Sequence, residues 1–235
     1  MKTKTMIVAA AIAASSGLAM ADFDAEYLGR TGSGTIHIDN TGTGGVINQN
    51  FSAGHLEFAY TDVGGQRGGG QFSGGTFNTF CIELQDIQNG THTYDVDAIQ
   101  NGPNPAPGVG GPAYDSADEA EVHAVVAAAI SLGWLNADLS AGASATDVRM
   151  TAIQGQIWKV LFDEAVVTGN GAVAPEMAAL AAEIALNPTA TVANMKAMLN
   201  ATTQDQLFIV PLPTAAFAGL LTLGGLGAFS RIRRR

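Results

Sequence analysis

The sequence predicts an α+β protein, in which a Gly-rich antiparallel β half is followed by an Ala-rich helical half and a C-terminal transmembrane helix. Three observations predict this fold class. Of the 29 glycines, 19 lie at 29–111 and only five at 112–210. Short β-branched and aromatic runs alternate with turn residues in the first half, whereas alanine-rich segments with helical periodicity fill the second. An uncharged apolar stretch lies close to the C-terminus.

The first 21 residues have the three parts of a secretory signal peptide. Lys2 and Lys4 form a basic start, 6–14 is an apolar core, and Ala19-Met20-Ala21 is a small-residue cleavage site. The alternative, a short N-terminal transmembrane helix, is disfavoured because the apolar run is too brief to cross a bilayer. We therefore expect an exported protein whose mature chain begins at Asp22.

The mature chain, 22–210, is long enough for one extracellular domain. Its β-rich part, 22–111, contains four apolar or β-branched runs bounded by turn residues, and each is a predicted strand: 35–39, 55–61, 76–84 and 91–99. A segment with four prolines and four glycines, 101–112, is a predicted loop.

The helical part, 112–205, contains alanine-rich segments that begin with acidic or capping residues, and Pro175 suits a first helical turn. The predicted helices are 116–135, 146–162, 174–186 and, more weakly, 190–199. The apolar run 206–210 is predicted to be a closing strand.

The last segment, 211–235, begins with Pro211-Leu212-Pro213, continues with an apolar stretch at 214–230 and ends with four arginines in the last five residues. Seventeen residues make a helix of about 26 Å, which just crosses a bilayer if the arginines snorkel. Positive charge stays on the cytoplasmic side. The alternative, a buried C-terminal core helix, gives the arginines no role.

This tail resembles the PEP-CTERM family of sorting signals, with Leu212 where the commonest motif has Glu. The resemblance implies that an exosortase-type sorting enzyme reads Pro211, Leu212 and Pro213. It also implies that the protein is first anchored in the membrane by the sorting helix, and then reaches the cell surface or the extracellular matrix.

Charge and residue content exclude several classes of function. The mature part carries 21 acidic and five basic residues, a net charge of −16, which repels nucleic acids. The four histidines show no metal-ligand spacing, and no serine-hydrolase elbow is present. We expect no metal, no cofactor and no catalytic residue of a turnover enzyme. Cys81 is the single cysteine, so no intramolecular disulfide can form.

Gln154 draws attention because it falls on the apolar side of its predicted helix, beside the stripe of Met150, Ile153 and Ile157. A buried amide without partners costs about 1–3 kcal/mol, so it needs a hydrogen-bond network or a chemical reason. Cys81 offers the chemical reason. If its sulfur attacks the Gln154 carboxamide, loss of ammonia leaves an internal thioester.

The pair Phe80-Cys81, together with Gln154, Ile157 and Trp158, resembles the thioester domains of bacterial surface adhesins. Ile153 and Gln156 replace a Thr and an Ala of that pattern. The resemblance implies adhesion through covalent attachment to an amine or hydroxyl on a target surface, in a single-use reaction. In that reading, Phe80 and Trp158 shield the acyl group from water.

Two other interpretations stay open. Cys81 can be a small core hydrophobe and Gln154 a satisfied core amide, in a structural matrix protein that has no thioester. A carbohydrate-binding surface protein is the third possibility, although the chain is poor in tyrosine and tryptophan.

Overall fold

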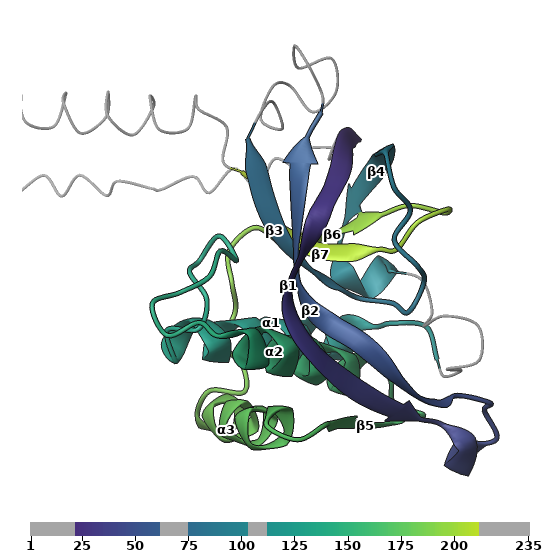
Figure 1. Ribbon diagram of the computed structural model, residues 1–235. Helices are drawn as coiled ribbons and strands as arrows, with labels where there is room; N and C mark the ends of the chain where they lie inside the picture. Colours follow the sequence, from purple (N-terminus) through teal and green to yellow (C-terminus); the bar gives the residue numbers. More distant parts are fainter. Residues whose placement is uncertain (1–21, 62–74, 103–111, 212–235) are drawn as a thin grey trace, which may run out of the picture.

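The computed structural model describes residues 22–61, 75–102 and 112–211, and within them the chain forms seven strands and three α-helices (Figure 1). The strands are β1 (Phe23–Asp39), β2 (Asn48–Tyr60), β3 (Thr76–Cys81), β4 (Thr91–Asp97), β5 (Val166–Gly169), β6 (Met195–Leu199) and β7 (Gln206–Ile209). The α-helices are α1 (Ser116–Ser131), α2 (Asp147–Leu161) and α3 (Val173–Leu186), and the short 3₁₀ turns are η1 (Thr41–Thr43) and η3 (Ile99–Asn101).

Six of the strands form a closed antiparallel sheet. Its strand order is β2-β3-β7-β6-β4-β1, and β1 pairs again with β2, so that the sheet has no free edge along this circuit. β5 pairs with the far end of β1 and extends the sheet beside the helices. The C-terminal strands β6 and β7 thus close a sheet that begins with the first residues of the domain.

β1 and β2 are long strands that belong to the closed sheet and also contact α2. Phe23 and Ala25 are buried at one end of β1, and Ile36 and Ile38 are buried at the other, which is the alternation expected of a half-buried strand. The pairing register shifts twice between these ends, so β1 bends from the closed sheet toward the helices (Figure 1).

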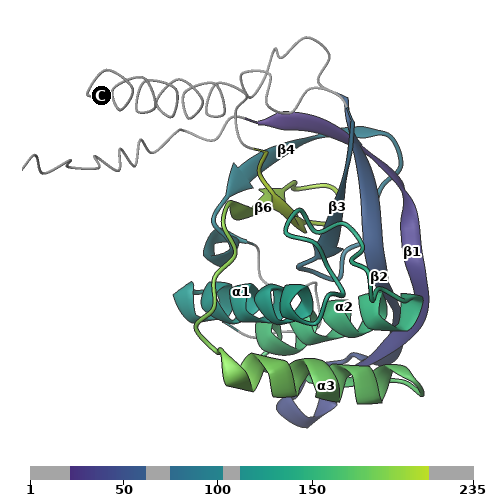
Figure 2. The same cartoon turned by 90° about the vertical axis from the view of Figure 1, so that its left-hand side faces the viewer.

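α2 packs against β1 and β2 and against both other helices, and Figures 1 and 2 show all three helices at one end of the sheet. Every residue from 150 to 158 is buried. Two glycines permit the close approach of strand and helix. A Cβ on Gly34 would lie 2.5 Å from the Thr151 side chain, and one on Gly155 would lie 2.6 Å from Ile36.

An aromatic cluster fills one end of the closed sheet. Phe58 on β2 packs against Tyr27, Phe77 and Tyr94, with ring centroids 5.5–6.2 Å apart. Phe208 on β7 lies 5.9 Å from Phe77. These rings come from five different strands, so their burial holds the sheet in its closed form.

The division into a β half and a helical half is wrong. β5 and β6 both lie within the stretch predicted to be helical, and the predicted helix at 190–199 is absent. Alanine, methionine and leucine favour helices locally, but Met195, Ala197 and Met198 are buried between β4 and β7 as a strand. The strand is entered through Asn194, whose left-handed φ of 59° interrupts a helix. The helices predicted at 116–135, 146–162 and 174–186 are present as α1, α2 and α3.

Within the described residues, no helix combines the length and apolarity needed to cross a membrane. The predicted transmembrane helix, 214–230, lies outside the described residues, as do the predicted signal peptide, 1–21, and two residues of the sorting motif, Leu212 and Pro213.

Candidate functional site

Cys81 is the last residue of β3, where that strand leaves its partner β2 and continues beside β7. Its main chain pairs with Gln206, and its side chain is 7% exposed. Phe77, Thr79 and Cys81 face one side of β3, because side chains two residues apart share a face. These side chains form a row along β3 that begins at Phe77 in the aromatic cluster. Cys81 is the last residue of the row, at the end toward the helices.

Gln154 lies in the middle of α2 and is fully buried. Its Oε1 accepts a hydrogen bond of 2.7 Å from the Cys81 main-chain N–H, and its Nε2 donates one of 2.8 Å to the Cys81 carbonyl oxygen. The structure thus brings together the cysteine and the glutamine that the sequence singled out, 73 residues apart. The contact runs through the main chain of Cys81, and it satisfies both ends of the buried amide.

The thiol of Cys81 contacts a different glutamine. Its Sγ donates to Oε1 of Gln204 at 2.8 Å. Gln204 is held from both sides, since its Nε2 donates to the Glu83 carbonyl oxygen at 3.0 Å and its Oε1 also accepts from Gln206 Nε2 at 3.1 Å. Sequence reasoning missed Gln204. The sequence feature that could have identified it is a run of polar residues, 203–206, which leads into the apolar residues of β7.

Burial raises the pKa of the Cys81 thiol to about 12, and the nearby Arg30 charge and Gln206 amide only partly oppose this effect. The sulfur is therefore protonated at neutral pH. Reactive cysteines of enzymes and redox proteins have lowered pKa values and stand in electropositive, exposed settings. Cys81 has the opposite environment, which disfavours a freely reacting thiolate.

Two buried acids, Glu83 and Asp205, lie next to Gln204. Glu83 Oε1 accepts from the Asp205 main-chain N–H at 2.8 Å, and Asp205 Oδ1 accepts from the Asn200 N–H at 2.6 Å. Burial, reinforced by the charge of Glu83, raises the pKa of Asp205 to about 8. Burial also raises the pKa of Glu83. The described residues contain no group of three or more His, Cys, Asp or Glu side chains able to hold a metal ion.

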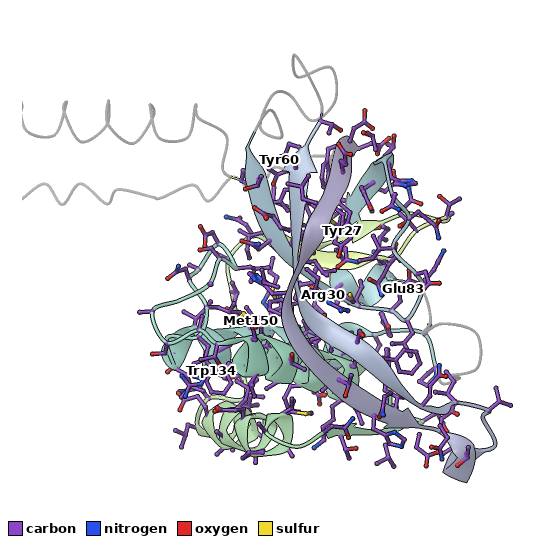
Figure 3. All side chains as sticks on the ribbon, viewed as in Figure 1. Tyr27, Arg30, Tyr60, Glu83, Trp134 and Met150 are labelled. Atoms are coloured by element: carbon purple, nitrogen blue, oxygen red, sulfur yellow. The ribbon has the colours of Figure 1, made fainter. Side chains whose placement is uncertain are left out.

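A cavity of about 320 Å³ connects Cys81 with the surface, and Gln204, Trp158, Tyr27 and Arg30 are among its lining residues. Figure 3 shows Arg30 on β1 near the level where the sheet meets the helices, and Tyr27 farther from the helices on the same strand. Trp158 is 2% exposed, and its indole Nε1 has no hydrogen-bond partner within the described part of the chain. Trp158 thus forms part of the cavity wall, and among the described residues its indole N–H is an unused hydrogen-bond donor.

Phe80 has another place. It is fully buried and packs on His55, with ring centroids 5.0 Å apart, and it is not among the residues that line the cavity. Its side chain leaves β3 on the face opposite to Cys81. Phe80, which the sequence placed at the pocket, therefore supports the core behind the strand instead of lining this cavity.

Comparisons with protein-family models, with curated proteins and with solved structures found no match to this chain.

Proposed function

We propose that this chain is an exported cell-surface protein that attaches itself covalently to a target through a thioester between Cys81 Sγ and Gln154 Cδ. One observation carries the proposal: the Gln154 carboxamide is seated on the Cys81 main chain by two hydrogen bonds, 2.7 and 2.8 Å long. Export rests on the signal-like sequence at 1–21.

The proposed bond forms within the folded protein. Cys81 Sγ attacks Gln154 Cδ, the Sγ–Cδ bond forms, the Cδ–Nε2 bond breaks, and the thiol hydrogen leaves with Nε2 as ammonia. Negative charge develops on Oε1 during the attack. The Cys81 N–H already donates to this oxygen at 2.7 Å, so a donor for the developing oxyanion is in position. Gln154 itself is fully buried, which limits the access of water to the acyl carbon.

Transfer to a target uses the cavity beside Cys81. An amine or hydroxyl that enters past Arg30 and Trp158 approaches the thioester from the Cys81 side, because Cys81 lines the cavity and Gln154 does not. It attacks the acyl carbon, an amide or ester forms, and the proton it releases restores the Cys81 thiol. The protein is consumed in the reaction, because the acyl group stays on the target. The product is a covalent link between Gln154 and the target surface.

The test is the intact mass of the purified protein, before and after methylamine. We expect a chain lighter by one ammonia that gains one methylamine, and Cys81→Ala should remove both changes. Gln156→Ala is the matched control, because Gln156 lies on the same buried helix but donates to the Met177 carbonyl oxygen at 3.0 Å. An unchanged mass with a titratable Cys81 thiol would refute the proposal.

A structural surface protein without a thioester is the second candidate, and one observation favours it. The Gln154 amide and the Cys81 thiol already have hydrogen-bond partners without any covalent bond. In this case Gln154 anchors the end of β3 to α2, and the mass measurement returns the unmodified chain.

A further inference from the structure

We propose that Gln204 is a positioning residue of this site, which holds the Cys81 thiol in one orientation by accepting its hydrogen. In the thioester reaction, Gln204 would keep the sulfur facing the cavity and ready to meet the Gln154 acyl carbon. This role rests on the proposed function, but the contact itself can be tested without it. The contact is the 2.8 Å hydrogen bond from Sγ to Gln204 Oε1.

The orientation of the Gln204 carboxamide is determined by its neighbours. Nε2 donates to the Glu83 carbonyl oxygen, and Oε1 accepts from Gln206 Nε2. A flipped amide would place its NH₂ group against two donors, the thiol and the Gln206 amide, and its oxygen against a carbonyl. The oxygen of Gln204 is therefore the group that faces the thiol.

The Gln206 side chain is held in turn. Its Oε1 accepts from Thr79 Oγ1 at 3.1 Å, and both Thr79 and Gln206 are fully buried. The chain of contacts Thr79, Gln206, Gln204 and Cys81 thus starts and ends on β3 and crosses to β7 and the segment before it. Such a fully paired buried network favours a single arrangement. The sulfur is placed by three side chains rather than by β3 alone.

A carboxamide oxygen is not a base at neutral pH, so Gln204 cannot remove the thiol proton. It can only orient the S–H group and favour its protonated form. Gln204 and Cys81 also line the same cavity, so the thiol is held on the route by which a reagent or target arrives. This predicts that the acceptor oxygen restrains thiol reactivity.

The deciding experiment uses the Gln154→Ala chain, in which no Cys81–Gln154 thioester can form and the thiol persists. Alkylation of Cys81 by iodoacetamide is followed by mass against pH, in this chain and with Gln204→Met or Gln204→Glu added. Methionine fills similar space without the acceptor, whereas glutamate retains an oxygen and, in its protonated form, also a donor to the Glu83 carbonyl oxygen. Gln85→Met is the control, because Gln85 lines the same cavity and has a similar side chain.

We expect Gln204→Met to accelerate alkylation about fivefold, the factor that corresponds to one lost hydrogen bond. Gln204→Glu should be no faster than its parent, and Gln85→Met should have no effect. If Gln204→Met is not faster, or if both Gln204 variants are faster, the positioning role is overturned, because general loosening of the fold would accelerate both.

The same substitution in the chain that retains Gln154 separates the two proposals. There, Gln204→Met should slow the loss of ammonia during refolding. If the parent never loses ammonia, the thioester proposal fails, while the alkylation series still decides the role of Gln204. If the parent does lose ammonia but Gln204→Met is not alkylated faster than Gln204→Glu, the thioester proposal is supported and the positioning role of Gln204 is refuted.

Discussion

The interior of the closed sheet has two ends that are equally buried but chemically opposite. One end holds aromatic rings, such as Phe58 and Phe208, and the other holds Thr79, Gln206 and the Cys81 thiol. The same strands supply both ends: on β7, Gln206 and Phe208 lie two residues apart and share a face. The change from apolar to polar side chains therefore takes only two residues along β7.

The comparison teaches what each kind of burial contributes. Aromatic packing has no strict partner requirement, so it stabilises the fold in proportion to the area removed from water. The polar end contributes less net free energy, because each hydrogen bond replaces one with water. It requires every partner to be in position, which orients the thiol. Stability resides at one end, and the geometry of the site at the other.

The largest expected effect belongs to the aromatic end. Phe58→Ala should lower the free energy of unfolding by about 3–5 kcal/mol, because a fully buried ring is replaced by a cavity. Urea unfolding followed by fluorescence measures it. Phe58→Leu is the control and should cost clearly less. A loss below about 1 kcal/mol for the alanine variant would mean that the rings do not hold the sheet closed.

The polar end should respond next. Gln206→Leu removes the acceptor of Thr79 Oγ1 and the donor to Gln204, and leaves both buried groups short of a partner. We expect a loss of about 2–3 kcal/mol in the same unfolding assay, together with faster alkylation of Cys81. Gln85→Leu, at a half-buried position, should stay within about 0.5 kcal/mol. Equal losses of unfolding free energy for Gln206→Leu and Gln85→Leu would show that the buried polar network has no special part in stability.

The acid pair gives a pH-dependent test. Because burial raises the pKa of Asp205 to about 8, the folded protein binds a proton that the unfolded chain releases near pH 4. This stabilising contribution is complete below about pH 4 and is lost as pH rises toward 8, at up to about 1.4 kcal/mol per pH unit. Asp205→Asn should flatten that part of the stability curve, measured by urea midpoints across the interval. An unchanged slope would place the proton on another group, with Glu83 as the first candidate.

The smallest effect concerns one hydroxyl. Thr79→Val keeps the shape of the side chain but removes the donor to Gln206, and should cost about 1 kcal/mol. Thermal unfolding is sufficient to detect it. Thr76→Val, at an exposed position of the same strand, is the matched control and should be nearly neutral. If Thr79→Val stabilises the protein, this part of the network does not need its hydrogen bonds.

Much of the local structure was predictable. Helices α1, α2 and α3 follow alanine-rich periodic segments with identifiable starts: the Asp115 side chain caps α1, and Thr146 caps α2. β6 was not predictable, because its residues are good helix formers and become a strand only through pairing with β4 and β7. The missed strand β5 is four residues long and gains its order from β1.

The sequence by itself determined that the chain has one cysteine and a glutamine on the apolar face of a helix, and from these two residues their proximity could be predicted. Only the tertiary structure decided that Gln154 hydrogen-bonds to the main chain of Cys81, whereas Gln204 accepts the hydrogen bond from its sulfur. The physical reason is sequence separation. Local periodicity reports which face of an element is buried, but Gln204 lies 123 residues from Cys81, and the two meet only when β7 closes the sheet beside β3.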